Sequence, residues 1–430
     1  MKPGSRKTIK GPKITFGLTF TVCLVLAAIP FIQLGYQYYL SAMTFSFLLV
    51  AGLLRLKDIL SLVPLLVLIL ILMLLPSLFY FDSYYALHNF LRAGREWLCF
   101  SLIYVFLVQA DSFRFRRQPN LAIVNVGLGV LIGGLLGFVI IQYVFLQKGI
   151  AVNIPAQYYI LNGGNIPTEL DLRWSHVRPS GPFGEPSYLG FVMLSLLVIV
   201  VHTVKHNKIK FILVIATMVT VLFANTLSGI LSCSVLALYF FWRRAYQGGQ
   251  RFLLAIVGVA AVGFVTLSGY NDIAARLANL NDKNVERSGY QRIVVPLKAA
   301  MRILSDAPLG IPSNELSSTL NKKYSKSEVE LEGQSANALL NLIINYGVVG
   351  ILILFLFVRA ARKNRILIAY VLFASMFNGG ILTFDKAAII GLAVLLISIS
   401  AEQKSERKVS SNPSARPSMG ASGTGLLATK

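Results

Sequence analysis

The chain has 430 residues, of which 55% are hydrophobic and only 13% are charged, and its formal net charge is +22. Soluble domains carry roughly a quarter charged residues, so this composition excludes a water-soluble globular fold. The basic residues are spread over separate short connections instead of one folded face, which argues against nucleic acid as a partner.

Apolar stretches of about 20 residues, long enough to cross about 30 Å of hydrocarbon, recur along the whole sequence. They predict an all-α, polytopic integral membrane protein with about twelve transmembrane helices. The first stretch follows basic residues as a signal peptide does, but it is too long for a signal-peptide core and is expected to be retained. The expected spans are residues 14–33, 36–54, 59–81, 88–110, 119–145, 187–204, 209–223, 226–242, 252–268, 337–358, 365–382 and 386–400.

Basic residues occupy every second connection between these spans, as the positive-inside rule requires. They are Lys2, Arg6, Lys7, Lys10 and Lys13; Arg55 and Lys57; Arg114, Arg116 and Arg117; Lys205, Lys208 and Lys210; Arg243, Arg244 and Arg251; Arg359, Arg362, Lys363 and Arg365; and Lys404, Arg407 and Lys408. Both termini are therefore expected to be cytoplasmic.

The spans divide the chain into segments of unequal length. The expected organisation is a cytoplasmic N-terminus (1–13), helices 1–5 (14–145), an outer loop (146–186), helices 6–9 (187–268), a large outer loop (269–336), helices 10–12 (337–400) and a disordered cytoplasmic tail (401–430). Long loops on a rigid scaffold are where binding and chemistry collect, so function is expected on the outer side.

The large outer loop contains a predicted amphipathic helix over residues 289–304. Its apolar face holds Tyr290, Ile293, Val294, Leu297, Met301 and Leu304, and its other face holds Arg292, Lys298 and Arg302. Such a helix is expected to lie along the membrane surface. Its cations either meet lipid phosphates and water, or Arg292 and Arg287 bind a pyrophosphate, to which a guanidinium fork is well suited.

The smaller outer loop ends in RPSGPFGEPSYLG, residues 178–190, directly before a span. Pro186 suits the first turn of a helix, and Glu185 lies where the helix dipole favours an anion. A helix start explains both residues. The alternative is a functional site that combines Arg178 and Glu185 with Arg173 and His176.

In the fourth span, Arg92, Arg95 and Glu96 share one helical face near the outer boundary. Ionisable groups at this depth are candidates for substrate binding. The other interpretation is that Arg92 pairs with Glu96 at i,i+4 while the arginines extend to the interface. Asp385 and Lys386, at the start of the last span, are expected to be an interfacial pair.

Four segments resemble a known family, in that family's order. SGPFGEPSYLG (180–190) resembles the SGxFxEPSxxG stretch of the O-antigen polymerase and O-antigen ligase superfamily, the Wzy-like proteins of bacterial surface polysaccharide assembly. Weaker similarities are NTLSGIL (225–231), RSGYQRIVVPLKAAMRILSDAPLGI (287–311) and NALLNLIINYGVVGILIL (337–354). Gly229 replaces a usual Arg. Ala336 precedes Asn337 where ligases of the superfamily carry His, which favours a polymerase.

The resemblance implies a GT-C-like bundle in the bacterial inner membrane with two periplasmic loops. It implies a glycosyltransferase that joins undecaprenyl-pyrophosphate-linked repeat units, with membrane lipid and a chain-length regulator protein as further partners. Positioning and charge neutralisation supply most of that chemistry. The candidate catalytic residues are Glu185, Arg178 and Arg292, and the candidate substrate-binding residues are Arg287, Arg173, His176, Arg92 and Arg95.

Neither a cofactor nor a metal is expected. Metal-dependent glycosyl transfer holds its cation with clustered carboxylates, and Glu169 and Asp171 are only a weak signal of that kind. His176 and His88 are the alternatives for the base that the ligase-type His would supply.

Three rival functions remain open. A lipid-linked oligosaccharide flippase or transporter would also have about twelve spans, but two six-span halves would show an internal repeat, and none is visible. The second rival is an O-antigen ligase, and the third is a structural membrane protein without catalysis.

Overall fold

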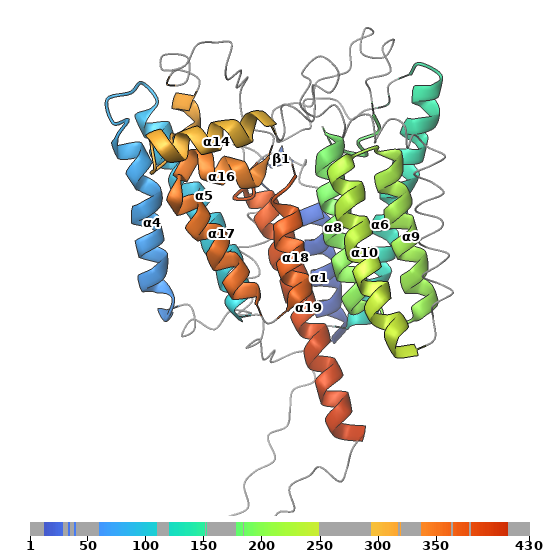
Figure 1. Cartoon of the computed structure of the whole chain (residues 1–430). Helices are drawn as coiled ribbons and strands as arrows, with labels where there is room; N and C mark the ends of the chain where they lie inside the picture. Colours follow the sequence, from blue (N-terminus) through green and yellow to red (C-terminus); the bar gives the residue numbers. More distant parts are fainter. Residues whose placement is uncertain are drawn as a thin grey trace, which may run out of the picture.

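Side-by-side helices make up most of the described chain, and one further helix lies across one end of the bundle (Figure 1). The computed structural model describes residues 13–28, 33–34, 38–39, 60–109, 120–150, 152, 178–183, 185–248, 294–316, 319, 337–362, 364–377 and 380–411. The elements are α1 (Lys13–Ala28), β1 (Gln33–Leu34), β2 (Tyr38–Tyr39), α4 (Val63–Leu78), α5 (Ala86–Gln109), α6 (Leu121–Gln147), α8 (Pro186–Thr203), α9 (Asn207–Phe223), α10 (Leu227–Gly248), α14 (Val295–Asp306), α16 (Ala338–Tyr346), α17 (Val348–Ala361), α18 (Arg365–Ala374) and α19 (Phe384–Ser411). The two short strands pair antiparallel. The end of the bundle crossed by α14 is called the α14 end below.

Three helices of the described residues are long and apolar enough to cross a membrane: Leu121–Gln147, Pro186–Thr203 and Phe384–Ala401. Shorter apolar helices occupy other expected spans, at Val63–Leu78, Ser228–Phe240, Val348–Ala361 and Arg365–Ala374. The protein is therefore a helical membrane protein. Twelve crossings stay a prediction, because the expected spans 36–54 and 252–268 fall largely or wholly outside the described residues.

Helices α8 and α19 form the centre of the bundle. Their apolar stretches are 83% and 89% buried inside the protein, whereas that of α6 is 39% buried. α19 packs against α8, α5 and α1, and α8 packs in turn against α9 and α10. Because every helix side here meets another helix, α8 and α19 are apolar all round instead of amphipathic.

Gly190 of α8 and Gly229 of α10 mark a close crossing of two helices. A Cβ atom added to Gly229 would collide with the side chain of Thr226, lie 2.9 Å from Cγ1 of Val221 and lie 3.2 Å from the Cα of Gly190. Small residues allow such an approach of helix backbones. This contact explains why glycine stands at 229, where the related motif has Arg.

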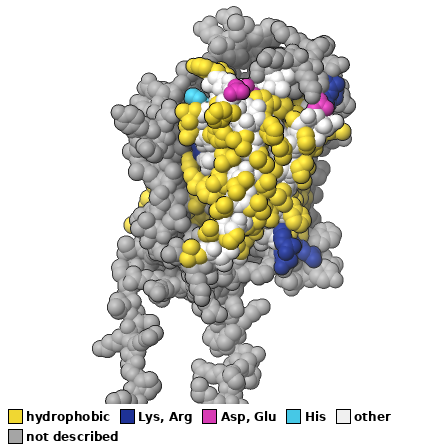
Figure 2. All heavy atoms as spheres, turned by 90° about the vertical axis from the view of Figure 1, so that its left-hand side faces the viewer, with side chains coloured by type: hydrophobic (Ala, Val, Ile, Leu, Met, Phe, Trp, Pro, Cys, Tyr) yellow, Lys and Arg dark blue, Asp and Glu magenta, His cyan; other side chains and the backbone are white. Residues whose placement is uncertain are grey.

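The side of the bundle formed by α4 presents an apolar surface. Val67, Leu68 and Ile71 are between 45% and 53% exposed. Figure 2 shows hydrophobic side chains over most of this face, with charged side chains toward its upper and lower ends. An apolar band between charged ends is the distribution expected of a surface in contact with lipid.

Helix α14 overlaps the predicted amphipathic helix from residue 295 on, residues 289–293 lie outside the described residues, and the face that α14 buries against protein is not the predicted apolar face. The buried residues are Val295, Pro296, Ala299, Ala300 and Ile303. Two members of the predicted face, Leu297 and Met301, are 46% and 67% exposed. The helix packs on α16 with Ala299 and Ala300 at the contact, which permits a close approach, while Leu297 and Met301 point away.

The last three expected spans differ in detail from the helices observed, and the last of them continues as α19 to Ser411, so the tail expected to be disordered from residue 401 begins as helix. The expected span 337–358 is two helices, α16 and α17, separated at Gly347. The expected span 365–382 ends as a helix at Ala374. Backbone oxygens of the following segment accept hydrogen bonds from the start of α16, with Leu339 N to Ser375 O at 2.8 Å and Ala338 N to Phe377 O at 3.2 Å. These non-helical peptides are thus bonded to protein instead of facing lipid.

Candidate functional site

The segment that follows α14 packs against the break between α16 and α17. Val348 donates its N–H to the Pro308 oxygen at 2.8 Å, and Ile311 donates to the Ile344 oxygen at 2.9 Å. Gly310 and Gly347 both have positive φ, at 92° and 53°, a region that glycine enters without strain. The chain therefore turns back along α16 and carries residues 312–315 to the part of α5 near the α14 end.

Glu96 of α5 connects the helix to this unit. Arg92 donates from Nε to Glu96 Oε1 at 2.8 Å, and Tyr346 donates its hydroxyl to Glu96 Oε2 at 2.9 Å. The predicted pairing of Arg92 with Glu96 is confirmed. Both carboxylate oxygens of Glu96 are occupied, and the side chain is almost fully buried. The Arg92 guanidinium is thus held by one nitrogen, and its two terminal nitrogens make no hydrogen bond to any other described residue.

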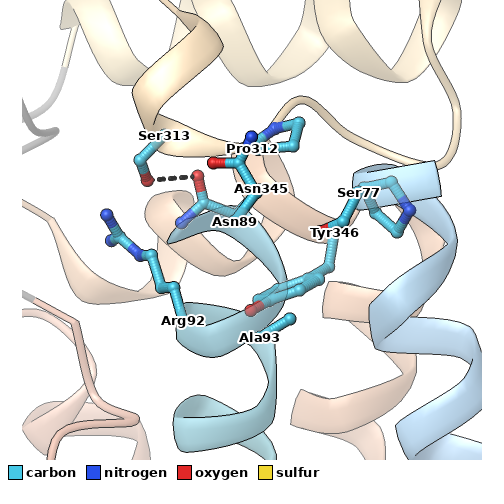
Figure 3. A pocket seen from close by; sticks show the side chains of 9 residues that line it. Ser77, Asn89, Arg92, Ala93, Pro312, Ser313, Asn345 and Tyr346 are labelled. Atoms are coloured by element: carbon cyan, nitrogen blue, oxygen red, sulfur yellow. Dashed lines mark hydrogen bonds between the residues drawn. The ribbon is translucent and has the colours of Figure 1, made fainter. Parts of the chain in front are cut away.

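A pocket with an empty volume of about 250 Å³ opens beside Arg92, and we call it the amide pocket (Figure 3). Its lining comprises Pro76, Ser77, Asn89, Arg92, Ala93, Pro312, Ser313, Asn345 and Tyr346. Figure 3 shows Asn89, Arg92 and Ala93 on α5, Ser77 on the neighbouring helix, and Asn345 bonded to Ser313 above them. Four separate parts of the chain therefore meet around one small polar space.

Hydrogen bonds fix the two amide side chains of this pocket. Ser313 donates from Oγ to Asn345 Oδ1 at 2.8 Å. Asn89 accepts at Oδ1 from Asn314 at 3.0 Å and donates from Nδ2 to Glu315 at 3.3 Å. Asn89 and Asn345 are 2% and 6% exposed, so their orientations are set by the protein and not by solvent.

A second pocket, with an empty volume of about 220 Å³, is also lined by Arg92. We call it the leucine pocket. It is lined by Arg92, Glu96, Ala338, Asn341, Leu342, Asn345, Gly380, Ile381 and Leu382. The two pockets share Arg92 and Asn345, so the same arginine lines both. A planar guanidinium with one nitrogen fixed and two free is well suited to bidentate binding of a phosphate oxygen pair.

The other candidates lie elsewhere or outside the described residues. Arg95 is exposed and lines neither pocket, and His88 is exposed. The candidates that fall outside the described residues are Arg173, His176, Arg287 and Arg292. Of the loop candidates, the structure therefore describes only Arg178 and Glu185.

Arg178 and Glu185 lie before and at the start of α8, and neither lines the amide pocket or the leucine pocket. Arg178 donates from Nη1 to the backbone oxygen of Asn225, in the turn between α9 and α10, at 3.0 Å. Asn225 has a φ of 46°, so this turn takes a conformation uncommon outside glycine. Glu185 is the N-cap residue of α8 and accepts from Ser187 Oγ at 3.0 Å. The helix-start interpretation of Glu185 is confirmed by this position.

The motif turn before α8 is anchored by Gln142 of α6. Gln142 Oε1 accepts from the backbone N–H of Ser180 at 3.1 Å and of Gly181 at 2.7 Å, and its Nε2 donates to the Gly181 oxygen at 3.0 Å. Gln142 is 2% exposed. A single buried amide therefore satisfies three backbone groups of residues 180–181.

Replacing Gln142 with Leu is expected to destabilise the protein by about 2 kcal/mol or more, because two buried N–H groups lose their acceptor. Thermal unfolding of the purified chain in detergent measures this. Gln147→Leu, at the exposed end of the same helix, is the matched control and is expected to leave the melting temperature nearly unchanged. Equal melting temperatures for both variants would contradict the anchoring role.

Asp385 and Lys386 are buried, which differs from the interfacial pair expected from the sequence. Each is 2% exposed. Tyr188 donates its hydroxyl to Asp385 Oδ2 at 2.7 Å, and the Lys386 ammonium lies 5.5 Å from the centre of the Phe191 ring. These contacts join the start of α19 to the SGPFGEPSYLG motif on α8. The tyrosine of that motif is therefore a structural link between the two central helices.

Sequence analysis missed the amide residues of the two pockets. Asn341 and Asn345 are one helical turn apart in an otherwise apolar stretch, and that spacing was the available signal. Asn89 and Ser313 carried no comparable signal, because their proximity depends on how the segment after α14 folds back. Among the described residues, no cluster of three His, Cys, Asp or Glu side chains is placed to hold a metal ion.

Comparison with known proteins bears on a segment that contributes part of this site. The sequence model of a family described as O-antigen ligase matches residues 211–355. The resemblance to the O-antigen polymerase and ligase superfamily is confirmed. No curated protein matches the chain.

The segment similar to the O-antigen ligase family covers most of α9, all of α10, α14 and α16, and about half of α17. It contributes Ser313, Asn345 and Tyr346, whereas Arg92 lies on α5, outside the match. Members of this family are membrane glycosyltransferase-like enzymes, ligases or polymerases. The match therefore indicates a function of that general type and does not distinguish the two.

Proposed function

We propose that the chain is a polymerase of O-antigen or a related surface polysaccharide. In this proposal the α14 end faces the periplasm, both termini are cytoplasmic, and the protein lies in the bacterial inner membrane. The substrates are two glycans, each linked to undecaprenyl pyrophosphate. The placement of basic residues on alternate connections supports this orientation.

The reaction transfers the growing glycan from its carrier to the non-reducing end of a new lipid-linked repeat unit. The bond between the anomeric carbon and the pyrophosphate oxygen breaks, and the acceptor hydroxyl forms the new glycosidic bond and loses its proton. Undecaprenyl pyrophosphate leaves with the bonding electrons. The main demand on the protein is therefore to stabilise negative charge on the departing pyrophosphate.

The observation that carries the proposal is the position of Arg92. Its Nε is held by Glu96, Glu96 is held by Tyr346, and Arg92 lines both pockets. Charge placed and oriented before the reaction stabilises a transition state without further reorganisation. We assign Arg92 to the leaving pyrophosphate.

The loop residues complete the proposed site. In this proposal, Arg173, Arg178, Arg287 and Arg292 add positive charge around the carrier phosphates. Glu185 is exposed at the start of α8 and either orients an arginine or accepts the proton of the acceptor hydroxyl. His176 is the further candidate for this base.

The residue before Asn337 favours a polymerase over a ligase. It is Ala336, where ligases of the superfamily carry His. Asn337 itself has a structural role, because its Oδ1 accepts from the backbone N–H groups of Leu339 and Leu340 at 3.1 and 3.2 Å and so caps α16. The ligase remains the second candidate, because the matched family is described as O-antigen ligase.

Deletion of the gene tests the polymerase directly. A host without the protein is expected to display surface glycan capped with a single repeat unit, and the wild-type gene on a plasmid is expected to restore the ladder of lengths. Electrophoresis of the extracted glycolipid measures this. Loss of all capped core would support the ligase or a flippase, and an unchanged ladder would overturn the proposal.

A further inference from the structure

Helix α17 carries an exposed apolar stripe, formed by Val348, Ile351 and Phe355, which we call the α17 stripe. These residues are 55%, 44% and 58% exposed, although α17 packs against α5, α16 and α18 on its other sides. Arg359 lies in the last turn of the helix and Arg362 caps it in a helical conformation. At about 3.6 residues per turn, all five residues fall within an arc of roughly 80°. The exposed side of α17 is therefore apolar along its length and cationic at its end.

The two arginines lie at the end of the bundle away from α14 (Figure 1). Arg359 and Arg362 are exposed, and neither guanidinium forms a hydrogen bond or an ion pair with a residue that the structure describes. Arg365, the first residue of α18, is exposed as well. Figure 2 shows Lys and Arg side chains below the hydrophobic surface on the α4 side of the bundle, at this same end. Unpaired positive charge thus meets apolar surface here.

The turn that presents the arginines is fixed by hydrogen bonds. Asn364 accepts at Oδ1 from the N–H of Ile366 at 3.1 Å and so caps α18, and its own N–H donates to the Ala361 oxygen at 2.9 Å. The N–H of Arg362 donates to the Arg359 oxygen at 3.3 Å. The arginines therefore have a defined backbone position at the end of the stripe.

The α17 stripe has the depth of one lipid leaflet. At about 1.5 Å per residue, Val348 and Arg359 are roughly 16 Å apart along the helix axis. The hydrocarbon core of a bilayer is about 30 Å thick, so each leaflet contributes about 15 Å. A phospholipid with an acyl chain along the stripe therefore places its phosphate at the level of the arginines.

Charge decides which lipid fits this surface best. A guanidinium binds a phosphate through paired, charge-assisted hydrogen bonds. In a zwitterionic lipid the headgroup's own cation competes for the phosphate, whereas an anionic lipid has no such competitor. Basic clusters at the ends of transmembrane helices bind anionic headgroups for this reason. A soluble anion would use the arginines but would gain nothing from the apolar stripe beside them.

We propose that the exposed side of α17 binds one anionic phospholipid, with an acyl chain along the α17 stripe and the phosphate at Arg359 and Arg362. In the orientation proposed for the protein, this lipid belongs to the cytoplasmic leaflet. The site lies at the opposite end of the bundle from the two pockets lined by Arg92. The inference does not depend on the proposed function.

Native mass spectrometry of the full chain, purified in detergent, tests the site. The probes are phosphatidylglycerol and phosphatidylethanolamine with identical acyl chains. Wild type is expected to bind the first phosphatidylglycerol about tenfold more tightly, the effect of one charge-assisted hydrogen bond. Arg359→Gln combined with Arg362→Gln is expected to reduce this ratio to about twofold or less, because glutamine is polar but carries no charge.

Two further variants make the test specific. Lys205→Gln combined with Lys208→Gln removes the same charge from exposed residues around the turn between α8 and α9, at the same end of the bundle, and is expected to keep the preference. Phe355→Ser interrupts the stripe at an exposed position. It is expected to weaken the binding of both lipids by about threefold and to leave the ratio between them unchanged.

The arginine variant is expected to fold and to keep its orientation. Both substituted side chains are exposed, and Lys363 and Arg365 still supply positive charge to the turn. Its melting temperature without added lipid is expected to equal that of wild type. A preference that survives the arginine variant, or that the lysine variant loses equally, overturns the site. Displacement of phosphatidylglycerol by glycerol phosphate would overturn it as well, because a soluble anion would then suffice.

Discussion

Arg92→Ala is expected to abolish the ladder of long glycans while the protein remains in the membrane. The variant removes the only arginine that lines both pockets. Loss of one preorganised group that stabilises transition-state charge typically lowers turnover by about 100-fold to 1,000-fold. A reduction of that size leaves only glycans of one or a few repeat units. Electrophoresis of surface glycolipid from a deletion host that expresses the variant measures this.

Arg92→Lys separates charge from geometry. Lysine keeps the positive charge but lacks the planar fork and cannot both bond Glu96 and present two nitrogens to the pockets. Partial activity, between the wild-type and Ala levels, is expected. This conservative variant also retains a cation beside the buried Glu96, so its loss of activity is not attributable to an unpaired carboxylate.

Arg95→Ala is the matched control for Arg92. Arg95 belongs to the same helix, less than one turn away, but is exposed and outside both pockets. Its replacement is expected to leave the ladder unchanged. A normal ladder in the Arg92→Ala strain, or an equal defect in the Arg95→Ala strain, would contradict the role assigned to Arg92.

Gly347→Ala is expected to destabilise the protein by about 3 kcal/mol or more. An added Cβ would collide with the backbone oxygen of Pro308, which is itself bonded to the N–H of Val348. The residue also has a φ of 53°, where a side chain adds strain. The colliding atoms belong to the backbone and not to the flexible end of a side chain. Relief of the collision therefore requires α16 and the segment after α14 to separate.

The stability of Gly347→Ala is measured as the melting temperature of the purified chain in detergent. Gly133→Ala in α6 is the control, because no other described atom lies within 4 Å of an added Cβ there. It is expected to melt as wild type does. Activity is expected to fall with stability only in Gly347→Ala, since Tyr346, the preceding residue, holds Glu96 and through it Arg92. Equal melting temperatures for the two variants would show that the tight junction at Gly347 does not exist.

Much of the fold was predictable because membrane insertion imposes local rules. A transmembrane helix must form its backbone hydrogen bonds internally and be apolar over about 20 residues. The apolar stretches of α6, α8 and α19 can therefore be predicted from composition alone. The Arg92 and Glu96 pair was predictable for the same reason, since residues four apart on a helix face one side.

The features that were not predictable depend on contacts between distant segments. The face that α14 buries depends on the surface of α16 beneath it, and the alanines of α14 fit that surface better than Leu297 and Met301 do. The break at Gly347 lies inside an apolar stretch that meets the requirements of a continuous span, and only its docking on Pro308 separates α16 from α17.

The sequence by itself determined the class of the protein, the positions of most of its apolar helices, and its resemblance to the O-antigen polymerase and ligase superfamily. These properties follow from composition, from the spacing of hydrophobic residues along the chain, and from local motifs. Only the tertiary structure decided which residues surround Arg92 and Glu96, because they come from distant segments of the chain; Tyr346, which donates to Glu96, is 250 residues away from it. Hydrogen bonds over such separations are set by packing, and packing has no signature in a short stretch of sequence.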